Sequence, residues 1–109
     1  LDEPVIVDLK TTERDADRSS WLVNVKKFGY REQCEFYRDG GEHEFGVRPR
    51  FIFVVVSAKT YSVRCYEPAP YEKSFFQRDA RERVTSGLHE LAACRASGDF
   101  SERQDVEHF

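Results

Sequence analysis

Residues 4–12 read Pro-Val-Ile-Val-Asp-Leu-Lys-Thr-Thr, and a sheet can be built outward from this stretch. The Val-Ile-Val run is typical of a strand that enters a sheet interior. Successive side chains of a strand point to opposite faces, so Asp8 and Lys10 share one face while Leu9 lies on the other. A carboxylate and an ammonium at the end of a buried strand are costly unless they pair or serve a chemical purpose.

Asp8 and Lys10 admit two interpretations. An Asp-x-Lys tripeptide is common by chance, and a salt bridge at a strand edge is its ordinary meaning. The alternative is a site that acts on phosphate, with Asp8 holding a divalent metal and Lys10 beside the attacking water or the phosphate. The apolar strand before the pair and the Thr-Thr exit after it favour this alternative.

The composition limits the chain to one small domain or part of one. Its 109 residues suffice for a single core, and its net charge of −3 gives no global basic field, so any DNA contact has to be a local patch. Methionine is absent and residue 1 leads directly into a strand. We therefore expect residues 1–109 to be a single domain cut from something longer.

The cysteines and the hydropathy indicate a cytoplasmic protein that has no contact with a membrane. Three widely spaced cysteines without zinc-type spacing are expected to be reduced, half-buried thiols. No stretch reaches membrane-spanning length or resembles a signal peptide. The three histidines are scattered without ligand spacing, which favours solvated surface positions.

The first half of the chain predicts a strand followed by two helices. Asp17, Ser19 or Ser20 is expected to cap a short helix that Gly29 ends. A second helix is expected over residues 30–43, with a last turn that could reach residue 46.

The second half predicts two strands and a long helix, which completes an α/β order. Residues 51–56 are apolar without alternation, as in a strand buried on both faces, and residues 61–66 alternate like a strand nearer an edge. A helix over residues 71–97 carries an apolar stripe that is expected to pack on the sheet. Arg48 and Arg50 flank the buried strand, where a charge pair is as plausible as a phosphate contact.

Gln33 and Tyr37 form a second motif. Residues four apart on a helix lie one turn above each other, so both side chains can face the same strand end. Taken alone, such a pair is more often a packing pair than a functional one.

Taken together, the two motifs resemble the PD-(D/E)XK nuclease superfamily and, more narrowly, the phage-type exonuclease VIII (RecE) family. The likeness covers most of the chain. After Asp-Leu-Lys-Thr-Thr it runs through Gly29-Tyr30, Gln33, Phe36-Tyr37, Asp39-Gly40, Phe45-Gly46-Val47, Pro49, residues 51–54, Leu91-Ala92-Ala93-Cys94 and Ser97-Gly98-Asp99-Phe100. The implied fold is a restriction-endonuclease-like mixed sheet flanked by helices, of which this chain would be the C-terminal part.

The resemblance also implies roles for individual residues. Asp8 would be an acidic metal ligand, Lys10 the active-site lysine, and the backbone carbonyl of Leu9 a further ligand. Gln33 and Tyr37 match the helix motif that touches the site or the nearby phosphate, and are grouped with the catalytic residues. The residues expected to contact nucleic acid are Thr11, Thr12, Tyr30 and Gln33.

The activity implied is a 5′-to-3′ exonuclease on linear double-stranded DNA in phage-type recombination, dependent on Mg²⁺ or Mn²⁺. Double-stranded DNA ends would be its substrate, a single-strand annealing protein its partner, and a ring-like homo-oligomer its assembly. A ring would retain DNA by topology and so would not need a positive net charge.

The sequence also departs from the family. The first aspartate and an upstream histidine have no counterpart, because Asp2 and Glu3 are too close to Asp8 on the same strand. The chain alone is therefore expected to be inactive. Two alternatives stay open: a non-catalytic DNA-binding or oligomer-assembly module with the same fold, or a site whose missing acid comes from another subunit.

Overall fold

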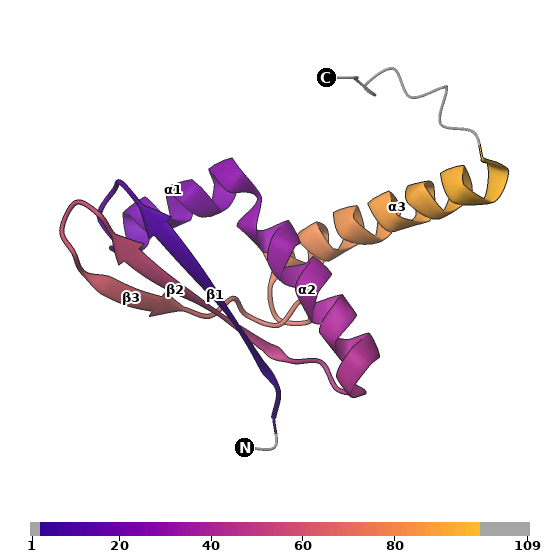
Figure 1. Ribbon diagram of the computed structural model, residues 1–109, viewed down its shortest axis with the longest axis horizontal. Coiled ribbons are helices and arrows are strands. Elements are labelled where there is room, and N and C mark those ends of the chain that lie inside the picture. The colour runs from indigo at the N-terminus through magenta and orange to yellow at the C-terminus, as the bar shows by residue number, and fades with distance from the viewer. Residues whose placement is uncertain (1–2, 99–109) are drawn as a thin grey trace.

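Strands β1 and β2 lie side by side and parallel in the computed structural model, which describes residues 3–98 (Figure 1). The elements along the chain are β1 (Val5–Thr12), α1 (Arg18–Phe28), α2 (Tyr30–Phe45), β2 (Arg50–Ser57), β3 (Val63–Tyr66) and α3 (Phe75–Ser97). This confirms the predicted order and the mixed α/β class. The predicted tail, residues 99–109, lies outside the described residues.

The sheet has the order β1-β2-β3, with β3 antiparallel to β2. Helices α1 and α2 form the crossover between the two parallel strands, as parallel pairing requires. Asp8 pairs in register with Phe53, and Lys10 with Val55. Within residues 3–98, β1 has a neighbour on one side only, so Asp8 and Lys10 lie on an edge strand and the interior position predicted from the apolar run was not found there.

The core lies between the sheet and the helices α1 and α2. Phe51, Phe53 and Val55 of β2 are buried on this face, together with Trp21 of α1 and Cys34 of α2. Alternate residues of β2 on the other face are only half-buried. The prediction that this strand is buried on both faces was therefore wrong for the described residues, because apolar character alone does not say how many layers cover a strand.

The outer face of the sheet is apolar and largely exposed. Val7 and Leu9 of β1 are 62% and 64% exposed, and Val63 of β3 is 58% exposed. Their register neighbours on β2, Ile52, Val54 and Val56, are apolar too, so these side chains form one continuous patch. Contiguous exposed apolar surface of this kind marks a face that another layer can cover.

Local sequence signals place the helix boundaries. The Asp17 carboxylate caps α1 by accepting a hydrogen bond from the Ser20 amide at 3.3 Å. Gly29 has φ of 66°, which ends α1 and starts α2. Helix α2 continues through Gly41, where a Cβ would lie 2.6 Å from Cγ of Pro49, so the absence of a side chain permits this close approach.

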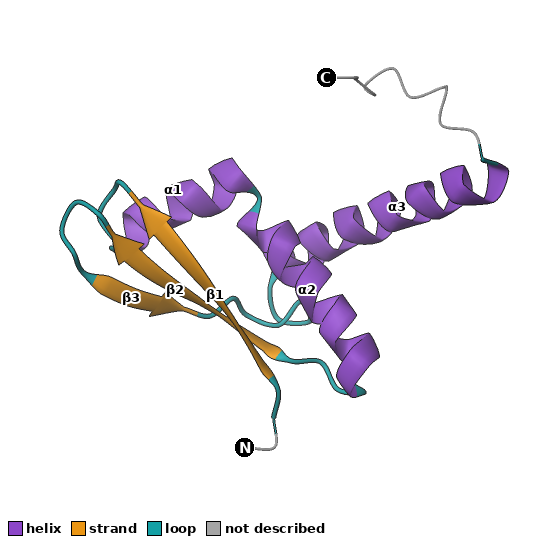
Figure 2. Cartoon of the chain, viewed as in Figure 1, coloured by secondary structure: helices purple, strands orange, loops and turns teal. Residues whose placement is uncertain are grey.

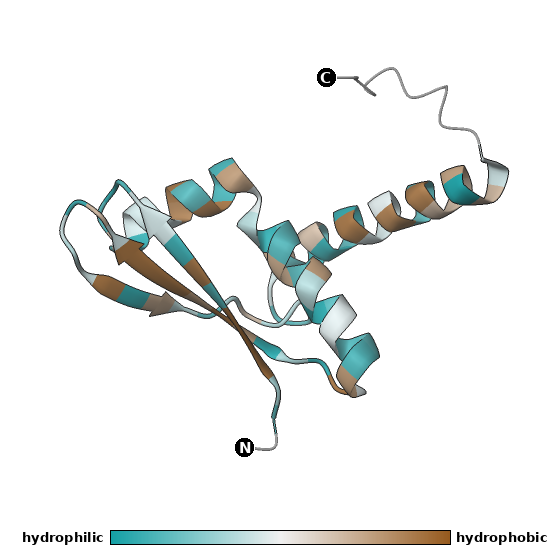
Figure 3. Cartoon of the chain, viewed as in Figure 1, coloured by the Kyte–Doolittle hydropathy of each residue, from teal (hydrophilic) through white to brown (hydrophobic). Residues whose placement is uncertain are grey.

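Helix α3 packs on α2 and not on the sheet, which contradicts the predicted packing of its stripe. It also begins at Phe75, capped by Ser74, rather than at residue 71. Figure 2 shows α2 lying between the sheet and α3, whose far half extends away. Hydrophobic residues recur along this far half, and Leu88 and Leu91 are about half exposed (Figure 3).

Two further expectations concern the described residues alone. Cys34 and Cys94 are buried and Cys65 is exposed, so the half-buried environment expected for each was not found. None of the helices in this part of the chain is long and apolar enough to cross a membrane.

Candidate active site

The centre of the candidate site is the pair formed by Asp8 and Lys10. Both side chains point to the helical face of β1 and are about one-fifth exposed, at 23% and 18%. The Lys10 Nζ lies 3.1 Å from the Asp8 Oδ2. Oδ2 is nonetheless buried without an aligned hydrogen-bond donor among the described residues, so the contact is an ion pair and the oxygen can accept a further ligand.

Lys10 is also held from the helix side by an aromatic ring. Its Nζ lies 4.6 Å from the ring centroid of Tyr30, the first residue of α2. That ring also packs against Phe28, at 5.7 Å between centroids, and against Trp21, at 5.4 Å, which restricts its motion. A cation over an aromatic face gains about 0.5–2 kcal/mol. The ammonium therefore has a fixed position between a carboxylate and a ring.

Helix α2 passes over β1 and brings the second motif to the same region. It starts with Tyr30 beside Lys10, and three turns later a Cβ on Gly41 would lie 3.4 Å from Cδ1 of Ile6. Gln33 and Tyr37 lie on α2 between these two points.

The two side chains of this motif differ in their environment. The Gln33 Oε1 is buried and has no hydrogen-bond partner among the described residues. The Tyr37 ring packs on Phe51 with centroids 6.2 Å apart and remains about half exposed. An unpaired buried carbonyl is costly, and such costs are found where a ligand or substrate supplies the partner.

The two threonines after Lys10 are separated by the pleat of the strand. Thr12 lies on the helical face, where its hydroxyl accepts hydrogen bonds from the Asn24 side chain and the Arg14 amide, both at 3.0 Å. Thr11 and the Leu9 side chain point to the outer face, so of Leu9 only the backbone carbonyl can serve the site.

Asn24 was not identified from the sequence, although a signal was present. It follows Trp21 by three residues, which places an amide on the apolar face of α1, and it is buried. A buried amide requires partners, and Thr12 is one of them. Asn24 therefore fixes the end of β1 just beyond Lys10.

The described residues supply one part of a divalent metal site. Asp8 offers a carboxylate, the ligand type that suits a hard cation, and its Oδ2 is ion-paired with Lys10. No group of three or more His, Cys, Asp and Glu side chains within residues 3–98 is arranged to hold a metal ion. The fit is therefore partial, because a second acidic ligand is missing from this part of the chain.

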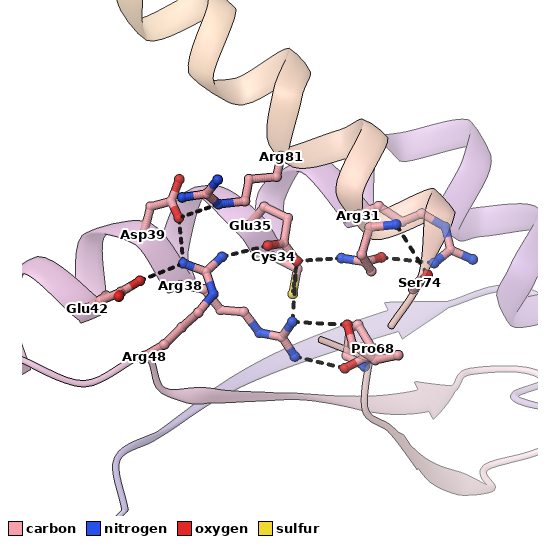
Figure 4. Close-up of polar contacts among 12 residues, drawn as sticks. Arg31, Cys34, Glu35, Arg38, Asp39, Glu42, Arg48, Pro68, Ser74 and Arg81 are labelled. Carbon is pink, nitrogen blue, oxygen red and sulfur yellow. Dashed lines mark hydrogen bonds and ion pairs between the residues drawn. The ribbon is translucent and has the colours of Figure 1, made fainter. Parts of the chain in front are cut away.

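A buried carboxylate, Glu35, holds α2, α3 and the start of β2 together (Figure 4). It is fully buried, accepting from Gln77 Nε2 and Arg48 Nη2 at 2.6 Å each and from Arg38 at 3.3 Å. Arg38 also donates to the carbonyl of Pro68 at 2.8 Å. This network fixes α2 in position above β1.

The arginines that flank β2 both form ion pairs, which confirms the charge-pair interpretation. Arg48 bonds to Asp39 as well as to Glu35, and Arg50 forms a bidentate pair with Glu67 at 2.7 and 2.9 Å. The hydrogen bonds from Arg50 lower the pKa of the Glu67 carboxyl.

The fold and the site define a class of protein. A parallel strand pair that carries an acid and a lysine on its helical face, completed by an antiparallel strand, is the nuclease-type arrangement of the PD-(D/E)XK superfamily. A family model described as a PDDEXK-like domain of unknown function (DUF3799) matches residues 1–106, so the chain belongs to this family. PD-(D/E)XK domains usually use divalent metals. None of the curated proteins compared with the chain matches it.

Proposed function

We propose that the chain is part of a metal-dependent exonuclease that hydrolyses linear double-stranded DNA from its 5′ ends. The ion would be Mg²⁺ or Mn²⁺, and the narrower likeness to the RecE family supports a role in phage-type recombination. The chain by itself is inactive under this proposal, because residues 3–98 offer a single carboxylate at the site.

The observation that carries the proposal is the half-buried pair of Asp8 and Lys10, with the Tyr30 ring of α2 packed against the ammonium. An ordinary surface salt bridge contributes little and does not need a buried, unpaired oxygen beside it. Here the Asp8 Oδ2 is buried and has only the Lys10 ammonium as its partner, and the Gln33 Oε1 is buried without a hydrogen-bond donor among the described residues. Two such acceptors next to a fixed ammonium suit a site where a cation and a phosphate bind.

The side chains have complementary tasks in this proposal. Asp8 contributes one oxygen ligand, and Lys10 donates a hydrogen bond to a phosphate oxygen or to the attacking water. A bound divalent ion lowers the pKa of water and offsets phosphate charge. Tyr30 keeps the Lys10 ammonium in place, and the Gln33 amide faces the same region.

The proposed partners follow from the family resemblance. They are double-stranded DNA ends, a single-strand annealing protein and further copies of the protein in a ring. A ring that encircles DNA is compatible with the net charge of −3, because it retains DNA by topology. A second acidic ligand would come from outside residues 3–98, including the possibility of a neighbouring subunit.

A non-catalytic binding or assembly module is the second candidate. It is favoured by the lone carboxylate of the site and by the uncovered apolar face of the sheet. In this case the Asp8–Lys10 pair would have only a structural role.

The test uses the full product of the gene that encodes the chain, incubated with end-labelled linear duplex and with closed circular duplex. Mg²⁺-dependent loss of the linear DNA alone is expected. Asp8→Asn and Lys10→Met should each lower the rate at least about 100-fold, since both groups act on the reacting phosphate. Asp15→Asn and Lys59→Met, which change exposed residues without described partners, are the matched controls.

Three outcomes would count against the proposal. Normal digestion by the Asp8→Asn variant would remove the site assignment. Cleavage of circular DNA at the same rate would remove the exonuclease assignment. A full-length protein that binds DNA ends without cutting them in Mg²⁺ or Mn²⁺ would favour the assembly module.

A further inference from the structure

A pocket of about 540 Å³ lies directly beside the candidate active site. It is bounded by α1, the first turns of α2 and α3, and strands β2 and β3. Tyr30, whose ring supports Lys10, lines the pocket, and so does Phe53, which pairs in register with Asp8. The pocket and the Asp8–Lys10 pair are thus adjacent, with the Tyr30 and Phe53 side chains between them.

The rim of the pocket carries an aromatic ring that is open to a ligand. Phe76 is 63% exposed although it is an apolar side chain at the start of a well-capped helix. The Arg31 guanidinium lies 5.1 Å from the Phe76 ring centroid and donates to the Gln77 side chain at 2.9 Å. This anchored arginine holds a planar cation at the ring, which suits stacking of a nucleobase.

The charge around the pocket is positive although the chain as a whole is acidic. Arg18 and Arg31 both line it, and Arg18 has no side-chain partner among the described residues. The acidic residue that lines it, Glu67, is already engaged in a bidentate pair with Arg50. An anionic ligand therefore meets two guanidinium groups and no unpaired carboxylate.

We propose that this pocket binds an unpaired nucleotide at a single-stranded DNA end, with the base against Phe76 and phosphates at Arg18 and Arg31. The volume lies within the roughly 300–1,000 Å³ range of small-ligand pockets. The proposal rests on the proposed function and narrows it, since it adds a subsite for an unpaired end next to the phosphate site. An apolar peptide is less well matched, because two charged side chains would have to be desolvated without partners.

The binding test uses the 109-residue chain and a six-nucleotide oligothymidylate in the presence of a chelator. Anisotropy of a fluorescein label on the oligonucleotide gives the affinity. Trp21, the one tryptophan of the chain, lines the pocket, so a change in its fluorescence locates the binding. Saturable binding with a matching change in Trp21 fluorescence is expected, together with weaker binding of a blunt duplex of equal length.

Matched variants separate the pocket from general electrostatic attraction. Phe76→Ala should weaken binding at least about fivefold, which is the lower limit for loss of one stacked base. Phe75→Ala removes the neighbouring exposed ring, which does not line the pocket, and should leave binding unchanged. Arg18→Gln should weaken binding more than Arg95→Gln, which removes the same charge in the last turn of α3. Phe76→Leu replaces Phe76→Ala if the alanine variant does not fold.

The proposal is overturned if the two phenylalanine variants bind equally well, or if the oligonucleotide binds without changing Trp21 fluorescence. Equal affinity for thymidine monophosphate would also overturn it, in favour of a free mononucleotide. Tighter binding of an apolar peptide than of the oligonucleotide would overturn the proposal in favour of a protein partner. Because the chelator removes metal ions, the binding result does not depend on cleavage. A protein that binds the oligonucleotide as expected but does not cleave DNA would contradict the proposed nuclease activity and leave the proposed pocket standing.

Discussion

Glu35→Gln tests whether one buried carboxylate holds the helices in the position that the site requires. The substitution keeps the shape of the side chain and removes its charge. In the native chain the Glu35 oxygens accept bonds from Arg48, Arg38 and Gln77, and Glu35 is fully buried. An amide in its place would offer one acceptor oxygen, and its NH₂ group would face donors. Arg38, which is almost completely buried, would thus lose its counter-ion, whereas Arg48 would keep its pairs with Asp39 and Glu42.

The expected loss is about 3–5 kcal/mol in the free energy of unfolding, the usual cost of removing one partner from a buried ion pair. A domain of this length has a total stability of about 5–15 kcal/mol, so the loss is a large fraction of it. The urea midpoint should fall by at least about 1 M. The melting temperature should fall by at least about 12 °C.

Urea unfolding followed by circular dichroism measures this effect, with Glu42→Gln as the control. Glu42 also bonds to Arg48, at 2.9 Å, but its side chain is half exposed. An exposed pair contributes about 0–1 kcal/mol, so the control should unfold near the wild-type midpoint. Equal midpoints for the two variants would refute the reasoning, because they would show that burial of the Glu35 carboxylate has no special energetic weight.

Two further predictions concern the site and the sheet. Gln33→Leu should leave the free energy of unfolding unchanged or raise it by about 1 kcal/mol, because it removes a buried unpaired carbonyl, and it should lower DNA cleavage by the full-length protein. A destabilised variant with normal cleavage would support the interpretation of Gln33 and Tyr37 as a packing pair. The double substitution Val7→Thr and Leu9→Thr should reduce self-association of the chain, measured by sedimentation velocity, because it makes the exposed outer face polar and keeps the strand propensity. Unchanged association would show that copies of the chain do not associate through this face.

Local chemistry made much of the fold predictable. Each predicted element exists, because strand alternation, helix caps and glycine breaks act over a few residues. Asp17 and Gly29 have the roles that their chemistry predicts, as a cap and as a left-handed helix boundary. The shared face of Asp8 and Lys10 follows from the two-residue period of a strand alone.

The packing of α3 was not predictable from its periodicity. A stripe of apolar residues shows that a helix has a face to bury, but it does not identify the surface that buries it. Helix α3 packs on α2, and Leu88 and Leu91 remain half exposed. The apolar run of β2 had the same ambiguity, since one covered face and two covered faces give similar sequences.

The sequence by itself determined the strand that carries Asp8 and Lys10, the two helices after it and the order of the elements, because these depend on neighbours along the chain. Only the tertiary structure decided which distant groups meet. It joined Glu35 to Gln77, placed Tyr30 under Lys10, and left the Gln33 carbonyl without a donor. These contacts depend on how whole helices pack in three dimensions, and the periodicity of a single segment does not predict that packing.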